Sequence, residues 1–225
     1  MVQALIFDVF GTCVDWRSSV AREVAADLPR VDALAFADAW RGEYQPAMER
    51  IRAADRGYVP LDVLHLENLH RVADRIGVIA PDSLNAAWEK LDPWPDVVEG
   101  LKHLKQSRII APCSNGSIAL MTRLAKYGRL PWDCILGADI ARDYKPKPEV
   151  YLAACSALDL PPGQVMMVAA HNDDLMAARD AGLRTGFVAR PTEYGPEQQA
   201  DLQPEADWDI VASDFVALAA EVNGR

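Results

Sequence analysis

The sequence predicts an α/β protein with a doubly wound parallel sheet as its core and a small all-helical cap inserted after the first strand. Short apolar runs alternate with amphipathic helical patterns over most of the 225 residues, which is typical of βαβ units. Between about Asp15 and Trp94 this alternation stops, and only helical spacing is found. A chain of this length suits one core with one smaller lid.

The first strand is expected at residues 3–9, where Asp8 lies within an apolar run. In the helical segment, five apolar residues recur at spacings of three and four: Phe36, Trp40, Tyr44, Ala47 and Ile51. The same pattern continues from Leu61 to Ile76, and the segment leaves through Pro93-Trp94-Pro95, a stiff exit typical of a hinge. The predicted core is therefore residues 1–14 plus 95–225, and the predicted cap is residues 15–94.

The remaining strands and helices follow in alternation after the cap. Further strands are expected at residues 109–114, 134–138, 165–170 and 185–188, with an edge strand near Ile210. Helices are expected at about residues 95–106, 117–127, 149–158, 173–181 and 214–222.

Composition excludes several classes of protein. The 23 Lys and Arg against 33 Asp and Glu give a net charge of -10, which repels phosphate backbones and argues against a nucleic-acid partner. The opening residues hold no basic leader, and the longest uncharged run has 14 residues, short of the roughly 20 that span a bilayer. Four cysteines without CxxC spacing suit free thiols, so we expect a cytoplasmic protein without a membrane segment.

Polar residues follow four of the predicted strands or units, at residues 7–12, 114–117, 144–148 and 169–174. In a doubly wound sheet, ligands bind outside these carboxyl ends. Asp8 lies in an apolar strand and must be paired or functional, and Lys145 is its natural partner. A carboxylate kept ionised by an ammonium group is a usable nucleophile. The alternative, with Asp8 capping the next turn and Lys145 solvated, carries equal weight on residue types alone.

These four segments, in this order and over the whole chain, resemble the haloacid dehalogenase superfamily. The resemblance implies a Rossmann-like core, with Asp8 as nucleophile, Ser114 in the second motif, Lys145 in the third and Asp173 and Asp174 in the fourth. The helical segment stands where that superfamily carries a small helical cap. Four ordered motifs are a strong signal, although each alone is weak.

The residue two positions after the nucleophile separates the chemistries of the superfamily. Its phosphatases resemble Asp-x-Asp, whereas this chain has Phe10, whose ring can neither donate a proton nor bind a hard cation. Asp-x-Phe-Gly-Thr instead resembles the 2-haloacid dehalogenases, as do Ser114-Asn115-Gly116 and the run from Lys145 to Tyr151. The resemblance implies hydrolysis of small 2-haloalkanoates to 2-hydroxyalkanoates through an aspartyl ester, with no cofactor and no metal.

The resemblance also implies roles for residues around the substrate. Trp40-Arg41 resembles the halide-binding pair of that family, and a fixed cation beyond the leaving atom stabilises the departing anion. Thr12, Ser114 and Asn115 are expected to hold the substrate carboxylate. Phe10, with Trp40 and Tyr44 from the cap, is expected to wall the cavity. The alternatives are structural: Arg41 lies at the surface, and Thr12 and Ser114 only cap backbone groups. Tyr151 then packs and does not orient Lys145.

The fourth motif departs from the best-known branch of the dehalogenases, which resembles Ser-Ser-Asn-x-x-Asp. Here Ala169, Ala170 and His171 precede Asp174. His171 could take the proton of the hydrolytic water, oriented by Asp174, Asp173 or a cap carboxylate, or it could only cap the next helix. A related branch with histidine here includes enzymes acting on fluoroacetate, so fluoroacetate is a possible substrate.

Two rival functions stay open at this stage. A magnesium-dependent phosphohydrolase or phosphonate-cleaving relative would use Asp173 and Asp174 as metal ligands, and a non-catalytic scaffold would bind an acid ligand or a partner protein. His65, His70 and His103 lack ligand spacing and are expected to pack or face solvent. Apolar residues exposed on the cap would permit a homodimer, which no motif requires.

Overall fold

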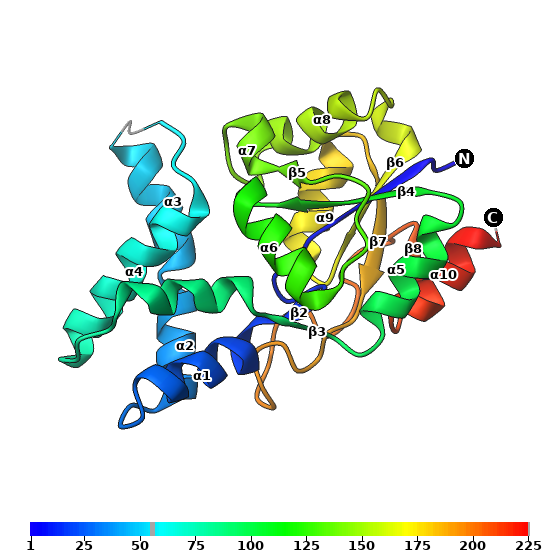
Figure 1. Cartoon of the computed structure of the whole chain (residues 1–225). Coiled ribbons are helices and arrows are strands. Elements are labelled where there is room, and N and C mark those ends of the chain that lie inside the picture. Colours follow the sequence, from blue (N-terminus) through cyan, green and yellow to red (C-terminus); the bar gives the residue numbers. More distant parts are fainter. Residues whose placement is uncertain (55–56, 225) are drawn as a thin grey trace.

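The computed structural model describes residues 1–54 and 57–224 and has a parallel sheet at its centre (Figure 1). Its six strands lie in the order β5 (Leu136–Gly137), β4 (Ile109–Ser114), β1 (Ala4–Phe7), β6 (Val165–Ala169), β7 (Arg184–Val188) and β8 (Ile210–Ala212). Every pairing in this sheet is parallel. The predicted α/β class and the edge strand at Ile210 are confirmed.

Helices cover both faces of the sheet, and the strand pattern explains why. On β1, Ala4 and Ile6 join one apolar cluster while Leu5 and Phe7 join the other, because side chains alternate along a strand. The helices α8 (Pro148–Ala157) and α9 (Asn172–Asp180) contribute side chains to the first cluster. The helices α5 (Val97–Lys105), α6 (Ile118–Gly128) and α10 (Phe215–Asn223) contribute side chains to the second cluster. Two short helices, α7 (Ala138–Ala141) and η2 (Pro162–Gln164), complete the connections.

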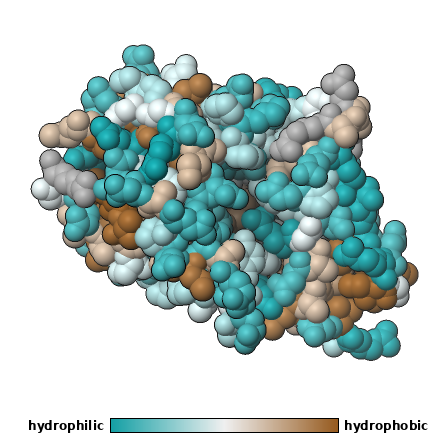
Figure 2. All heavy atoms as spheres, turned by 180° about the vertical axis from the view of Figure 1, so that it is seen from behind, coloured by the Kyte–Doolittle hydropathy of each residue, from teal (hydrophilic) through white to brown (hydrophobic). Residues whose placement is uncertain are grey.

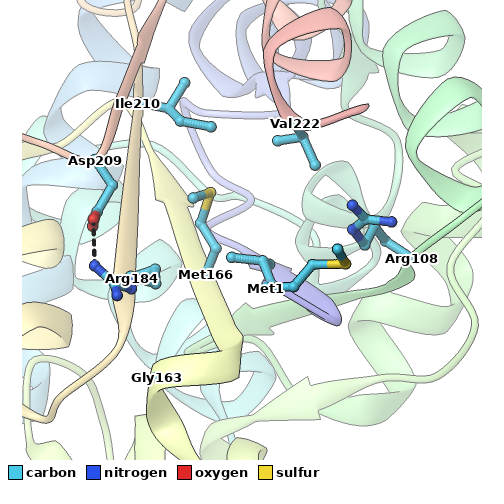
Figure 3. A pocket seen from close by; sticks show the side chains of 9 residues that line it. Met1, Arg108, Gly163, Met166, Arg184, Asp209, Ile210 and Val222 are labelled. Atoms are coloured by element: carbon cyan, nitrogen blue, oxygen red, sulfur yellow. Dashed lines mark hydrogen bonds and ion pairs between the residues drawn. The ribbon is translucent and has the colours of Figure 1, made fainter. Parts of the chain in front are cut away.

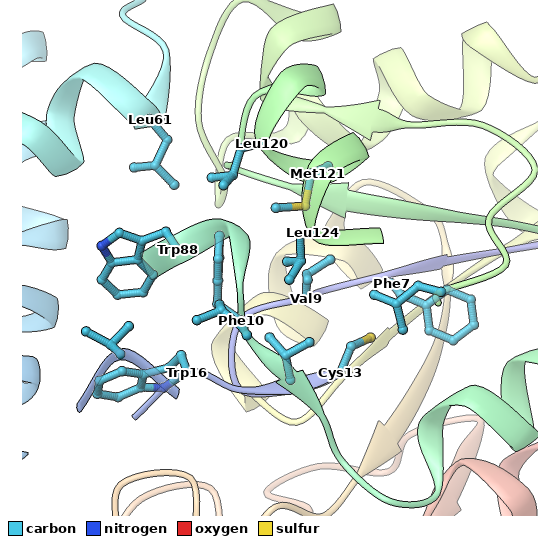
Figure 4. Packing of buried hydrophobic residues seen from close by; sticks show 14 of the residues in the cluster. Phe7, Val9, Phe10, Cys13, Trp16, Leu61, Trp88, Leu120, Met121 and Leu124 are labelled. Carbon is cyan, nitrogen blue, oxygen red and sulfur yellow. The ribbon is translucent and has the colours of Figure 1, made fainter. Parts of the chain in front are cut away.

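Between β1 and β4 the chain forms a bundle that lies beside the sheet (Figure 1). Its helices are α1 (Trp16–Asp27), α2 (Ala33–Gly42), α3 (Tyr44–Ala53), α4 (Leu61–Ile76) and the 3-10 helix η1 (Asp82–Glu89). Asp15 and Asp32 cap α1 and α2 by accepting from backbone N–H groups. Aromatic rings fill the bundle, and Figure 4 shows Trp16 and Trp88 beside Phe10, which follows β1.

Two features of the bundle differ from the sequence-based expectation. The periodic run from Phe36 to Ile51 is split between α2 and α3, because Pro46 has no N–H to donate to the carbonyl of Gly42. A two-stranded antiparallel ribbon, β2 (Val14–Asp15) with β3 (Asp92–Pro93), was not predicted, since two residues per strand are too few for a periodic signal. At its end, the indole of Trp94 donates to the carbonyl of Gly11 at 2.8 Å.

The strand order changes direction at β1, which lies between β4 and β6. The carboxyl ends of these three strands therefore meet at one edge, where open α/β sheets bind ligands. The space-filling view in Figure 2 shows a surface that is mostly hydrophilic, with hydrophobic residues in small patches. Among the described residues, no helix combines the length and the hydropathy needed to cross a membrane.

Candidate active site

A cavity of about 470 Å³ lies at the carboxyl ends of β1, β4 and β6, beneath the helical bundle. From the bundle and β1 side it is lined by Asp8, Phe10, Arg41, Tyr44, Gln45 and Glu49. From the rest of the chain it is lined by Asn115, Lys145, Pro146, His171, Asp173, Asp174, Tyr194 and Asp201. Seven of the predicted site residues thus meet around one cavity: Asp8, Phe10, Arg41, Asn115, Lys145, His171 and Asp174.

Lys145 joins the carboxylate of Asp8, which is buried, to that of Asp174, which is partly buried. Its ammonium nitrogen lies 2.9 Å from Oδ1 of Asp8 and 2.5 Å from Oδ2 of Asp174. Tyr151 donates its hydroxyl to Oδ1 of Asp174 at 2.5 Å, so both oxygens of Asp174 are occupied. Asp174 and Tyr151 therefore fix the position of Lys145, and Tyr151 is buried and does not line the cavity.

Burial and charge act in opposite directions on Asp8. Removal from water alone would raise the pKa of Asp8, but the charges and hydrogen bonds of Lys145 and His171 outweigh it and hold that pKa well below its usual range. Burial likewise opposes the charge of Lys145, but the carboxylates of Asp174 and Asp8 raise the pKa of Lys145 above its usual range. At neutral pH, Asp8 is a carboxylate and Lys145 an ammonium ion.

Two residues predicted to hold the substrate carboxylate are committed to other bonds. The hydroxyl of Thr12 donates to Oδ2 of Asp8 at 2.8 Å and accepts from the backbone N–H of Ala170 at 2.9 Å. Ser114 is fully buried, and its Oγ accepts from the backbone N–H of Gly116 at 3.1 Å. Neither lines the cavity. Contact of Thr12 and Ser114 with a substrate carboxylate therefore stays a prediction.

Asn115 connects the second motif to both the third motif and the bundle. Its Oδ1 accepts from the backbone N–H of Lys145 at 2.7 Å, and its Nδ2 donates to the hydroxyl of Tyr44 at 2.8 Å. Asn115 lines the cavity, as Tyr44 does. An amide at this position can therefore reach a bound molecule while it holds the loop of Lys145 in place.

His171 lies between two carboxylates. Its Nδ1 is 3.1 Å from Oδ2 of Asp8, and its Nε2 is 2.8 Å from Oε2 of Glu193. Burial opposes the imidazolium form, but Glu193 and Asp8 outweigh it and raise the pKa of His171 well above its usual range. The expected orienting partner is Asp174, Asp173 or a cap carboxylate, whereas the structure places Glu193 and Asp8 at the two ring nitrogens. Asp174 is bonded to Lys145 and Tyr151 instead.

Glu193 was missed by the sequence analysis. It follows β7 in the loop before β8, is 1% exposed, and accepts the indole N–H of Trp16 at 3.0 Å through Oε1. Glu193 lies five residues beyond the end of β7, in a loop without periodicity, so no sequence pattern marks it. Trp16 opens α1, so Glu193 links His171 to the helical bundle.

Arg41 and Trp40 point in different directions. The guanidinium carbon of Arg41 lies 4.1 Å from the ring centre of Tyr44, and the residue lines the cavity. Trp40 is 1% exposed, packs against Phe36 and Trp88, and donates its indole N–H to the carbonyl of His65 at 2.9 Å. Neighbours on a helix differ by about 100°, and of this pair Arg41 lines the cavity while Trp40 does not. Contact between Trp40 and a substrate stays a prediction.

The cavity does not fit the oxygen ligand set that magnesium needs. Phe10 stands where a second carboxylate would be required, and both oxygens of Asp174 are bonded to Lys145 and Tyr151. Across the described residues, no group of three or more His, Cys, Asp or Glu side chains is arranged to hold a metal ion. Asp174 is therefore a poor candidate for the metal ligand of a phosphohydrolase.

A second hollow, of about 310 Å³, lies at the opposite end of the sheet strands (Figure 3). It is lined by Met166 of β6, Arg184 of β7 and Ile210 of β8, together with Arg108. Arg184 is paired with Asp209 at 2.9 Å, the contact drawn as a dashed line in Figure 3. This hollow lacks the paired carboxylates and lysine of the first cavity, which is the stronger candidate for chemistry.

Comparisons with known proteins agree with the fold. The model of the haloacid dehalogenase-like hydrolases matches residues 2–182. (S)-2-haloacid dehalogenase 4A of Burkholderia cepacia is 32% identical over 205 residues, which cover 86% of this chain and 87% of that protein. The crystal structure of a defluorinating L-2-haloacid dehalogenase shares 48% identity with a TM-score of 0.96, covering 99% of this chain and 95% of that one.

Another solved L-2-haloacid dehalogenase is 43% identical, with a TM-score of 0.96 and complete coverage of both chains, 100% each. The resemblance seen in the four sequence motifs is thereby confirmed. The chain belongs to the haloacid dehalogenase-like hydrolase family.

Proposed function

We propose that this protein hydrolyses the carbon–halogen bond of small 2-haloalkanoic acids, giving 2-hydroxyalkanoic acids and halide. The observation that carries the proposal is the buried Asp8 carboxylate, held ionised by Lys145 in a cavity where a phenyl ring replaces the second acid of phosphatases. The names of similar proteins support (S)-2-haloacids as the substrate class.

In the first half-reaction, an oxygen of Asp8 attacks C2 of the substrate from the side opposite the halogen. The new C–O bond forms as the carbon–halogen bond breaks, and the halide leaves with the bonding electron pair. Arg41 lines the same cavity and places a cation where this charge develops. Asn115 and the ammonium of Lys145 supply donors for the substrate carboxylate.

In the second half-reaction, water attacks the carbonyl carbon of the Asp8 ester. His171 cannot accept a proton in the free protein, because its raised pKa keeps it an imidazolium between Asp8 and Glu193. Esterification removes the negative charge of Asp8, and with it one of the two causes of that raised pKa. His171 can then lose its proton to solvent in the cavity and accept a proton from the attacking water. When the C–O bond between the Asp8 carbonyl and the substrate oxygen breaks, His171 gives this proton to the departing alkoxide. The second proton of the water passes from the Asp8 carboxyl to His171, which restores the carboxylate and the imidazolium.

The bundle and the core take separate parts in this proposal. Residues 15–94 act as the cap, which closes the cavity with Arg41 and Tyr44, and residues 1–14 plus 95–225 form the core that holds the nucleophile. All four cysteines are free thiols, which supports a reducing, cytoplasmic location. A homodimer remains a prediction.

Ion chromatography of halide released from chloroacetate, bromoacetate, fluoroacetate and 2-chloropropanoate tests the proposed function. Halide is expected to be released at the same rate in the presence and in the absence of EDTA. No release from any of these acids would favour the non-catalytic scaffold, and chelator-sensitive turnover of a generic phosphate ester would favour a phosphohydrolase.

A further inference from the structure

Glu193 joins the helical bundle to the proposed base. Its Oε1 accepts the indole N–H of Trp16 at 3.0 Å, and its Oε2 lies 2.8 Å from Nε2 of His171. His171 in turn contacts Oδ2 of Asp8 through Nδ1 at 3.1 Å. A chain of contacts therefore runs from the bundle to the nucleophile, and it begins at Trp16, the first residue of α1.

The carboxylate of Glu193 has little freedom to move. The residue is buried, so water is not available to replace a lost partner. Gly11, in the turn after the nucleophile, has a φ of +88°, and a Cβ at this position would overlap the carboxylate of Glu193. The carboxylate therefore lies directly against that turn, while Trp16 and His171 each contact one of its two oxygens.

The indole of Trp16 is fixed by the rings around it. It stacks on Trp88 with ring centres 6.4 Å apart and meets Tyr194 edge-on at 5.9 Å. The guanidinium carbon of Arg41 lies 5.6 Å from its ring. Figure 4 shows Trp16 and Trp88 together on the bundle side of the sheet. Because these contacts fix the plane of the indole, its N–H stays directed at Glu193.

This N–H changes how strongly Glu193 holds the proton of His171. A donor on one oxygen stabilises the carboxylate charge, so Glu193 attracts the imidazolium less than a carboxylate without this donor would. His171 must lose that proton before it can act on water. Trp16 should therefore favour the neutral form of His171 once the ester has formed.

We propose that Trp16 is a positioning residue for ester hydrolysis: through Glu193 it holds the imidazole of His171 at Asp8 and weakens the attraction of Glu193 for the imidazolium proton. The inference rests on the proposed function, because it concerns the second half-reaction. Attack of Asp8 on the substrate does not need a neutral His171, so Trp16 should act on ester hydrolysis and leave ester formation nearly unchanged.

The pH dependence of ester hydrolysis distinguishes this role from packing. Charged or titratable groups of the bundle and the core line the cavity around His171, among them Asp8, Arg41, Lys145, Asp173, Asp174 and Tyr194. In the ester Asp8 is uncharged, and Arg41 and Lys145 keep pKa values above their usual ranges despite burial. Burial and the charge of Glu193 raise the pKa of Tyr194. The acid limb between pH 5 and 9 is therefore assigned to His171.

Trp16→Phe removes the donor and keeps a ring. The acid limb of ester hydrolysis, measured in single turnovers, should move up by about 0.5–1 pH unit, opposite to the shift expected for Glu193→Gln. Below the limb, the hydrolysis rate should fall about three- to tenfold. The rate of the first halide release should change less than about twofold.

Trp88→Phe is the matched control, because Trp88 stacks on Trp16 and its indole nitrogen has no hydrogen-bond partner within the described part of the chain. It should leave the acid limb in place. In the Glu193→Gln background, Trp16→Phe should move the limb much less, because the charge on which it acts is gone. An unmoved limb in Trp16→Phe alone, or equal slowing of both half-reactions, would show that Trp16 only packs and would overturn the inference.

The indole N–H resonance of Trp16 tests the same contacts in a protein that keeps this residue. With the resonance assigned through the backbone, His171→Ala should shift it, because Glu193 loses its second partner, whereas His103→Ala should not. The same resonance position in wild type and His171→Ala would contradict the inference, also where Trp16→Phe does not fold. A wild type that releases no halide would contradict the proposed function. Turnover with an unmoved limb in Trp16→Phe would contradict this inference alone.

Discussion

The Nδ1 atom of His171 lies 3.1 Å from Oδ2 of Asp8, so the residue proposed to activate water touches the nucleophile itself. With Glu193 at 2.8 Å on its other side, the imidazole carries a proton until the charge of Asp8 is removed. The charge of Asp8 therefore sets the order of the two half-reactions. The ester forms while His171 is an imidazolium, and His171 can become a neutral base only after the ester has formed.

Replacement of His171 separates the two half-reactions. His171→Ala is expected to release about one equivalent of halide per active site in a burst, and then to stall with the ester on Asp8. Rapid-quench halide analysis with intact-protein mass spectrometry measures both. His103→Ala, at a half-buried histidine on α5 that does not line the cavity, is the control and should turn over normally. Steady turnover without an accumulated ester in His171→Ala would remove the base assignment.

The pH dependence of ester hydrolysis reports on Glu193. Its charge raises the pKa of His171, also after esterification has removed the charge of Asp8, and the base must be neutral. The rate of ester hydrolysis should therefore rise with pH through the pKa that His171 has in the ester. Glu193→Gln removes the charge and keeps an acceptor for Trp16, so the pKa of His171 falls and the acid limb moves to lower pH. Single-turnover rates of ester hydrolysis, measured for the wild type and Glu193→Gln across pH 5–9, locate the acid limb of each. If the acid limb lies at the same pH in both proteins, another group is titrating.

Lys145 is expected to be far more important than its neighbour Lys147. Lys145→Met leaves Asp8 and Asp174 without their shared cation, so the pKa of Asp8 rises and kcat/KM should fall about 100-fold or more. Lys147 is exposed and pairs with Asp143, and Lys147→Met should change activity less than about twofold. Circular dichroism and thermal melts check that both variants fold. Comparable activities in the two variants would contradict the charge-partner role.

Trp40 and Arg41 are expected to differ although they are adjacent. Arg41→Met removes the cation from the cavity and should reduce halide release strongly, whereas Trp40→Phe should retain most of the activity. Trp40→Phe loses the hydrogen bond to the carbonyl of His65 and should reduce the free energy of unfolding by about 1 kcal/mol. Urea unfolding and halide release measure the two effects. A large activity loss in a stable Trp40→Phe protein would support the sequence-based assignment of Trp40.

Much of the fold could be predicted because its pattern is local. Buried strands such as β4 are short apolar runs, and Leu61–Ile76 repeats at helical spacing, so both stand out in the sequence. The two-residue strands β2 and β3 carry too few side chains to form a pattern, and Pro46 broke a helix whose apolar periodicity continued across the break.

The candidate site could be predicted only in part, because strand ends bring residues together without fixing where hydroxyls point. Asp8, Lys145 and Asp174 follow from the strand-end rule and the motif spacing. Thr12 and Ser114 also lie at strand ends, but nearby N–H groups engage their hydroxyls. Glu193 lies in a loop without periodicity, and only the folded chain reveals its contact with His171.

Single-turnover hydrolysis in oxygen-18 water tests most directly whether Asp8 bonds to substrate carbon. With enzyme in excess over haloacid, the label should enter the Asp8 side chain, detected by mass spectrometry of the peptide that contains it, while the first hydroxy acid released carries unlabelled oxygen. Label found in the first hydroxy acid, with Asp8 unlabelled, would mean that water attacks the substrate directly and would contradict the account.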